Sequence, residues 1–159
     1  SVFNLQGVEW AEKLGMKRYK IASRCIGQQD LFDAVGETGK DMIVSLGMWH
    51  DANPTAPLPT HIKSKGKVDF LYCVAKYPTM PEDVDFDKID FKDKYSGFSD
   101  HTIGMNAPLI AVARGARILE KHFTLSKKMH GPDHQGSMEP NELRQLVKSA
   151  REFEEFMSK

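Results

Sequence analysis

The hydrophobic positions of the chain fall into five short runs separated by longer segments, several with apolar residues at helical spacing. The runs are rich in β-branched and aromatic residues and predict buried strands at Tyr19–Ser23, Met42–Gly47, Val68–Ala75, Tyr95–His101 and Arg117–Phe123. Helical spacing occurs near residues 8–14, 31–35, 107–112 and 143–156. Successive strands begin 22 to 27 residues apart. This repeat predicts right-handed βα units and a parallel sheet.

Five such units fit either a small open sheet or part of a barrel. A complete (β/α)₈ barrel usually takes about 250 residues, whereas five units use all 159 residues here. No glycine-rich GxGxxG or GxxxxGK[ST] turn follows a predicted strand, which removes the best support for a nucleotide-binding sheet. Residues 49–59 and 124–139 fit no regular element, and such loops are often functional. We expect a single α/β domain over residues 1–159.

Charge and cysteine content exclude several classes of partner. The 22 Lys and Arg residues balance 22 Asp and Glu residues, so no bulk field attracts nucleic acid or an anionic membrane. No apolar run approaches the roughly 20 residues of a membrane span, and the first residues lack the pattern of an export signal. Cys25 and Cys73 are too few for a disulfide scaffold, and we expect small buried thiols in a cytoplasmic protein.

Polar side chains collect at the carboxyl ends of the predicted strands, where parallel α/β folds hold their ligands. Ser99 and His101 share one face of the fourth strand, and Glu120 and His122 share one face of the fifth. If these strands are neighbours, both imidazoles reach the same point. Two imidazoles with oxygen donors suit a divalent ion such as Mn²⁺, Co²⁺ or Zn²⁺ and leave positions open for water or substrate.

Simpler interpretations stand beside this one. A histidine at a strand end is commonly an ordinary polar residue, so the pair matters only if the two rings converge. Lys20 in an apolar strand must find an anion, either a structural carboxylate or a charged group of a substrate. His130 and His134 are expected in a loop, because the Gly and Pro between them prevent a helix, and His50 and His61 are expected at the surface.

Motifs at these positions resemble those of the sialic acid synthase family, which condenses phosphoenolpyruvate with an N-acylated amino sugar. The matching segments are Tyr19–Ser23, Ile43–Met48, Tyr77–Thr79, Gly97–Gly104, Glu120–Thr124, and Gly131–Asp133 followed by Ser137. Together they span nearly the whole chain. The most specific feature is the segment SDHT followed by EKHFT.

The resemblance implies a metal-dependent partial (β/α)₈ TIM barrel in which His101 and His122 hold the divalent ion. Mn²⁺ is the expected ion, with Mg²⁺, Co²⁺ and Zn²⁺ as alternatives. Glu120 joins the two histidines among the expected catalytic residues.

The resemblance also implies contacts with two substrates, phosphoenolpyruvate and an N-acyl amino sugar. Lys20, Ser45 and Ser99 are expected to contact the phosphate or carboxylate of phosphoenolpyruvate. Tyr77 and Asp133 are expected to contact the sugar.

Several departures from the family pattern shape the expected function. Three earlier barrel strands and a C-terminal antifreeze-like domain are expected to be absent, and the isolated chain to be inactive. Cys25, Leu46 and Ala75 replace a glutamate, a threonine and a polar residue, which alters the sugar pocket. An incomplete barrel exposes strand edges, so we expect a second copy or a complementing barrel half. A catalytically silent sugar- or phosphate-binding subunit and another metal-dependent TIM-barrel enzyme remain alternatives.

Overall fold

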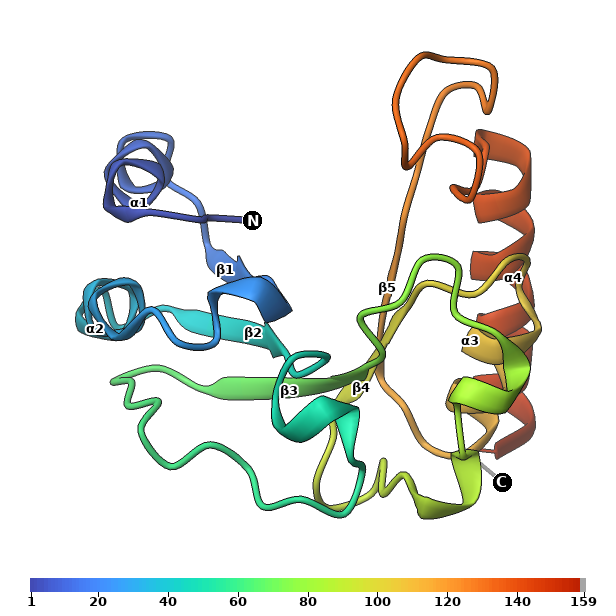
Figure 1. Ribbon diagram of the computed structural model, residues 1–159, viewed down its shortest axis with the longest axis horizontal. Helices are drawn as coiled ribbons and strands as arrows, with labels where there is room; N and C mark the ends of the chain where they lie inside the picture. Colours follow the sequence, from blue (N-terminus) through green and yellow to red (C-terminus); the bar gives the residue numbers. More distant parts are fainter. Residues whose placement is uncertain (158–159) are drawn as a thin grey trace.

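The strands of the computed structural model, which describes residues 1–157, form one parallel sheet in the order β1-β2-β3-β4-β5. They are β1 Arg18–Ile21, β2 Asp41–Ser45, β3 Val68–Cys73, β4 Gly97–Asp100 and β5 Ile118–Lys121. In Figure 1 the sheet curls instead of lying flat, so that β5 stands up from the plane of β1 to β3. The parallel arrangement is the one that the strand repeat predicted.

Four α-helices accompany the strands: α1 Leu5–Lys13, α2 Gln29–Glu37, α3 Asn106–Ala113 and α4 Pro140–Met157. Helix α1 begins after Asn4, whose side chain accepts a hydrogen bond from the Gly7 N–H at 2.8 Å. Helix α4 begins at Pro140, and proline is tolerated in the first helical turn because that turn needs no backbone N–H. None of the helices within residues 1–157 has the length and apolar content needed to cross a membrane.

Strand and helix do not alternate at every step. The described connections from β2 to β3 and from β3 to β4 contain only short 3₁₀ turns, at His50–Ala52, Pro81–Asp83 and Phe86–Lys88. Three prolines lie within residues 49–59 of the first connection. Proline lacks the N–H of a helical hydrogen bond and clashes with the preceding turn, so an α-helix cannot run through this segment.

The two faces of the sheet differ in chemistry. Buried apolar side chains such as Ile21, Val44 and Phe98 belong to the main hydrophobic cluster, which packs with residues of the helices. Their neighbours in sequence point to the opposite face, because strand side chains alternate. That face carries polar residues, including Lys20, Ser45 and Ser99. The fold therefore presents a polar inner surface backed by an apolar core.

A buried carboxylate lies near the amino ends of the strands. Asp69 pairs with Lys67 at 2.8 Å and accepts a hydrogen bond from the Ser96 hydroxyl at 2.5 Å. Burial alone raises the pKa of Asp69, but the hydrogen bonds from Lys67 and Ser96 and the charges of Lys67 and Arg18 outweigh it. The pKa of Asp69 therefore lies below its ordinary 3.8.

This lowered pKa makes the contribution of Asp69 to stability depend on pH. The stabilisation is present above the pKa of the unfolded chain and is lost as the pH falls through the folded-state pKa. Asp69→Asn should lower the free energy of unfolding at pH 7 by about 1 to 3 kcal/mol, and the difference should shrink at pH 3. Urea unfolding at both pH values measures it. Asp93→Asn, at an exposed carboxylate, is the control, and a difference that does not change with pH would contradict this account.

Candidate functional site

The register of β4 and β5 brings the two predicted metal ligands to the same level. Asp100 lies opposite Lys121 in the ladder, so the next residues along the two strands, His101 and His122, meet where the strands end. Their ring centroids are 5.2 Å apart and their planes are nearly perpendicular, at 86°. The convergence that the sequence pattern required is therefore present.

The hydrogen bonding of His101 assigns its tautomer. Its Nδ1 lies 2.7 Å from the Val74 carbonyl oxygen, which can only accept, so Nδ1 carries the proton and donates it. Burial lowers the pKa of His101 below its ordinary 6.5, which outweighs the opposing effects of the Val74 bond and the nearby carboxylates. The ring is thus neutral near pH 7 with a lone pair on Nε2. Metal-binding histidines are commonly oriented by a backbone carbonyl in this way, so His101 fits the role.

The protein ligand set for such an ion is small. Within residues 1–157, no group of three or more His, Cys, Asp or Glu side chains is arranged to hold a metal ion. Two imidazoles would leave most coordination positions to water or substrate, which is typical of a catalytic site and not of a structural one.

Glu120 is the centre of a polar cluster beside the histidines. Its Oε2 lies 3.1 Å from Lys20 Nζ and accepts hydrogen bonds from the hydroxyls of Ser99 at 2.6 Å and Ser45 at 3.2 Å. Burial raises the pKa of Glu120, but the charge of Lys20 and these three donors outweigh it, so the pKa is lowered and the carboxylate stays ionised. The anion beside Lys20 in this structure is therefore a carboxylate of the chain itself.

The histidines lie between two hollows. The inner hollow, of about 420 Å³, is lined by both histidines together with Lys20, Ser45, Ser99, Glu120, Cys73, Arg24 and other residues. The outer hollow, of about 400 Å³, is lined by both histidines together with Tyr77, Asp133, Thr102, Gln135 and other residues. The Tyr77 ring centroid lies 4.1 Å from that of His101 and 5.6 Å from that of His122. The structure thus brings every predicted site residue to one of two adjoining spaces.

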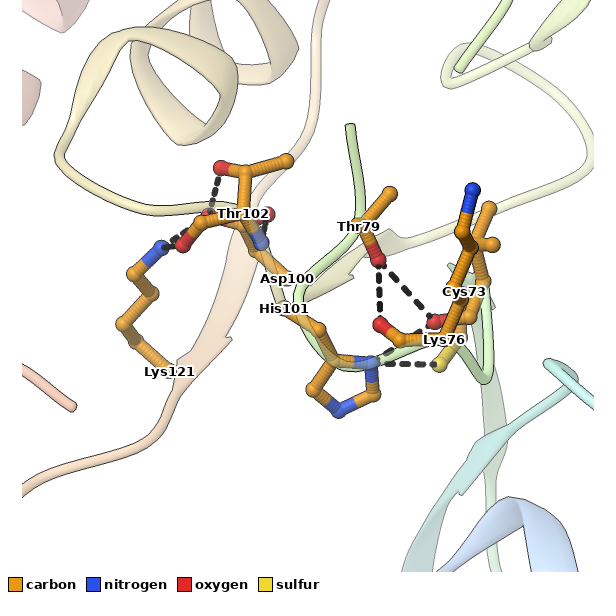
Figure 2. A network of polar contacts seen from close by, with 8 residues as sticks. Cys73, Lys76, Thr79, Asp100, His101, Thr102 and Lys121 are labelled. Carbon is orange, nitrogen blue, oxygen red and sulfur yellow. Dashed lines mark hydrogen bonds and ion pairs between the residues drawn. The ribbon is translucent and has the colours of Figure 1, made fainter. Parts of the chain in front are cut away.

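A buried ion pair directly precedes the two histidines in the sequence, since Asp100 precedes His101 and Lys121 precedes His122. Lys121 Nζ lies 2.5 Å from Asp100 Oδ2, and the two side chains are 4% and 0% exposed. Lys121 also donates to the Thr102 carbonyl oxygen, and Asp100 accepts from the Thr102 N–H at 2.8 Å. Figure 2 shows this network, with the His101 ring turned away from it toward Cys73. Sequence reasoning missed this ion pair. The alternation of strand side chains offered a signal, because Asp100 and Lys121 each follow or precede an inward-facing residue, and charged residues at such positions need a partner.

Three of the remaining histidines have contacts of different kinds. His134 Nδ1 lies 2.7 Å from the Thr124 hydroxyl, within the loop predicted for this segment. His50 is exposed, as expected. His61, which was expected at the surface, is half-buried: its ring packs edge-on against Phe32, with the ring centroids 6.1 Å apart, and its Nε2 contacts a backbone carbonyl.

The three substituted positions lie at different depths. Cys25 and Leu46 are buried, as is the free thiol of Cys73. Only Ala75 among the three lines the inner hollow. Its small apolar side chain offers no hydrogen bond to that surface.

Comparison with known proteins relates the whole chain to one family. A family model described as the NeuB family matches residues 1–159. The chain is 35% identical over 162 residues to the N,N'-diacetyllegionaminic acid synthase of Campylobacter jejuni, covering 98% of this chain and 48% of that protein. It is 33% identical over 149 residues to the N-acetylneuraminate-9-phosphate synthase of Homo sapiens, covering 91% of this chain and 42% of that protein.

A solved structure shows the same architecture. The N-acetylneuraminic acid (sialic acid) synthetase of Leptospira borgpetersenii serovar Hardjo-bovis matches with a TM-score of 0.84 at 31% identity, covering 99% of this chain and 56% of that chain. With the curled parallel sheet, this likeness confirms the predicted partial TIM barrel. The chain spans about half the length of the curated relatives it matches.

Proposed function

The chain belongs to the NeuB family, and we propose that it supplies the metal-binding side of the active site of an N-acylneuraminate-type synthase. Such an enzyme condenses phosphoenolpyruvate with an N-acyl amino sugar to give a nonulosonic acid. The observation that carries the proposal is the convergence of His101 and His122 beside the ionised carboxylate of Glu120. The names of the relatives, synthases of legionaminic and neuraminic acids, support it.

The two histidines are the proposed metal ligands. His101 would bind through Nε2, the nitrogen that its bond to Val74 leaves free. When bound, a divalent ion supplies positive charge that polarises the aldehyde of an open-chain sugar. We propose Mn²⁺, with Mg²⁺, Co²⁺ and Zn²⁺ as alternatives.

Side chains of the inner hollow would bind the anionic co-substrate. Lys20, Ser45 and Ser99 direct an ammonium group and two hydroxyls at one point, now occupied by the Glu120 carboxylate. A phosphate or carboxylate of phosphoenolpyruvate would draw on the same donors. Glu120 is ionised in this structure and lines the same hollow, so it would accept the proton of the water that attacks after carbon–carbon bond formation, before phosphate leaves.

Side chains of the outer hollow would position the sugar. Tyr77 packs beside both imidazoles, and Asp133 lies in the loop that closes this side. A phenol hydroxyl and a carboxylate are suited to hydrogen-bond sugar hydroxyl and amide groups. Holding the aldehyde next to the enol carbon converts an encounter in solution into a reaction between oriented groups.

A partner is part of the proposal. Strands β1 and β5 are the two edges of the sheet, and Val2 adds one parallel bridge to Ile21 beside β1. Unpaired strand edges favour pairing with further strands. We propose that a complementing barrel half or a second copy closes the barrel, and that the protein works in the cytoplasm, in keeping with two buried free thiols.

Phosphate release from phosphoenolpyruvate tests this function. The chain would be co-expressed with the amino-terminal half of the Campylobacter jejuni synthase and supplied with phosphoenolpyruvate, Mn²⁺ and a panel of N-acyl amino sugars. We expect release that requires both sugar and metal, and little or none from the chain alone. Ligand binding without release would indicate a silent subunit, as the apolar Ala75 would favour. Turnover that does not need phosphoenolpyruvate would indicate another metal-dependent enzyme, and either result would overturn the proposal.

A further inference from the structure

The inner hollow carries one uncompensated positive side chain. Its charged lining residues are Lys20, Arg24, Lys121, Asp100 and Glu120. Lys20 is paired with Glu120 at 3.1 Å, and Lys121 with Asp100 at 2.5 Å. Among the lysines and arginines that line this hollow within the described chain, Arg24 alone has no carboxylate within ion-pair distance. An anion entering here would meet two neutralised lysines and one free guanidinium.

The backbone under Arg24 is well fixed. The residue lies in the short turn Ser23–Cys25 directly after β1, and both of its neighbours are buried while Arg24 is exposed. The Cys25 N–H donates to the Ala22 carbonyl at 2.9 Å, and the Ser23 hydroxyl accepts from the Gly47 N–H at 2.9 Å, which ties the turn to the end of β2. The arginine therefore extends from a rigid base at the carboxyl end of the sheet.

The Arg24 side chain is held in one orientation, and its N–H groups are free to bind a ligand. The guanidinium carbon of Arg24 lies 4.4 Å from the Phe3 ring centroid, a cation–π contact that restrains the side chain. No hydrogen bond within residues 1–157 engages its N–H groups. Phe3 and Arg24 both line the inner hollow, so the unoccupied donors stand at its rim.

The chemistry of a guanidinium selects the ligand. Its planar fork matches a phosphate oxygen pair, and it keeps its charge at every physiological pH. A neutral sugar gives it no charged group to pair with. We propose that Arg24 holds the phosphate group of a phosphate monoester at the rim of the inner hollow. The inference rests on the proposed function only for the identity of the ester, which would be phosphoenolpyruvate or a phosphorylated N-acyl amino sugar.

Isothermal titration calorimetry on the chain tests this assignment. The ligands are phosphoenolpyruvate, an N-acyl amino sugar phosphate, and pyruvate, which keeps the carboxylate but lacks the phosphate. Arg24→Gln should weaken binding of the phosphate ester about 10- to 100-fold and leave the thermal midpoint unchanged, because the side chain is exposed. Arg24→Lys should restore part of the affinity. Arg144→Gln, which makes the same charge change on α4, should bind like the wild type.

The outcomes separate this inference from the proposed function. Equal binding of phosphoenolpyruvate and of the sugar phosphate by Arg24→Gln and the wild type would overturn the assignment. So would an equal loss for pyruvate, which would make Arg24 a carboxylate ligand. Arg24-dependent binding of the sugar phosphate without any binding of phosphoenolpyruvate would support the inference while the proposed function fails. A wild-type chain that binds no phosphate ester would overturn the inference, whereas the proposed function is tested by phosphate release from the co-expressed halves.

Discussion

Replacing His101 by alanine is expected to weaken Mn²⁺ binding at least about 100-fold, more than the loss of a supporting outer-shell partner usually causes. The His101 ring is hydrogen-bonded to the Val74 carbonyl through Nδ1, which leaves Nε2 free. Its centroid lies 5.2 Å from the centroid of the His122 ring. Because the proposed ligand set has two protein imidazoles, losing either one removes half of the metal ligands that the protein supplies. His122→Ala should therefore have a similar effect.

Competition with a fluorescent chelator measures these affinities. His134→Ala is the matched control, because that imidazole is bonded to Thr124 within the described chain and is not a proposed ligand. It should bind Mn²⁺ like the wild type. Should His101→Ala and His122→Ala also bind like the wild type, the ion would have to lie elsewhere.

Lys121→Met is expected to lower the free energy of unfolding by about 3 to 5 kcal/mol. The substitution leaves the Asp100 carboxylate, which is 0% exposed, without its cation. Its remaining donors, the N–H and hydroxyl of Thr102, do not replace a full charge. Urea denaturation followed by circular dichroism gives the free energy of unfolding.

Two further variants distinguish the effect of breaking the buried ion pair from the effect of removing a lysine. Lys148→Met removes a lysine from an exposed pair with Glu152, at 3.7 Å with side chains 76% and 55% exposed, and should cost less than about 1 kcal/mol. The double variant Asp100→Leu with Lys121→Met removes both charges and should recover much of the loss. If Lys121→Met destabilises no more than Lys148→Met, the buried pair does not stabilise the fold.

The sequence allowed the faces of β4 and β5 to be predicted, because side chains alternate with a period of two. Because these strands are neighbours, Ser99 and His101 face the same space as Glu120 and His122. Alternation does not determine the register of β4 against β5. A shift of one residue would move every side chain of a strand to the other face.

Contacts across the curled sheet were beyond sequence reasoning. Lys20 lies on β1 and Glu120 on β5, at opposite edges of the strand order, and only the curvature of the sheet brings them to 3.1 Å. An anion for Lys20 was predictable from the cost of burying an unpaired charge, but the choice of carboxylate was not. The absence of an α-helix between β2 and β3, by contrast, was predictable from the sequence, because the prolines within residues 49–59 do not allow a helix there.

Pulsed electron paramagnetic resonance of the Mn²⁺-loaded chain tests whether both imidazoles bind one ion. Hyperfine coupling reports the nitrogen atoms bound to the ion, and ¹⁵N-histidine labelling identifies them as imidazole. We expect two coordinated imidazoles in the wild type and one in each of His101→Ala and His122→Ala, under loading conditions that saturate the site. A spectrum without imidazole coupling, or one that neither substitution alters, would contradict this expectation.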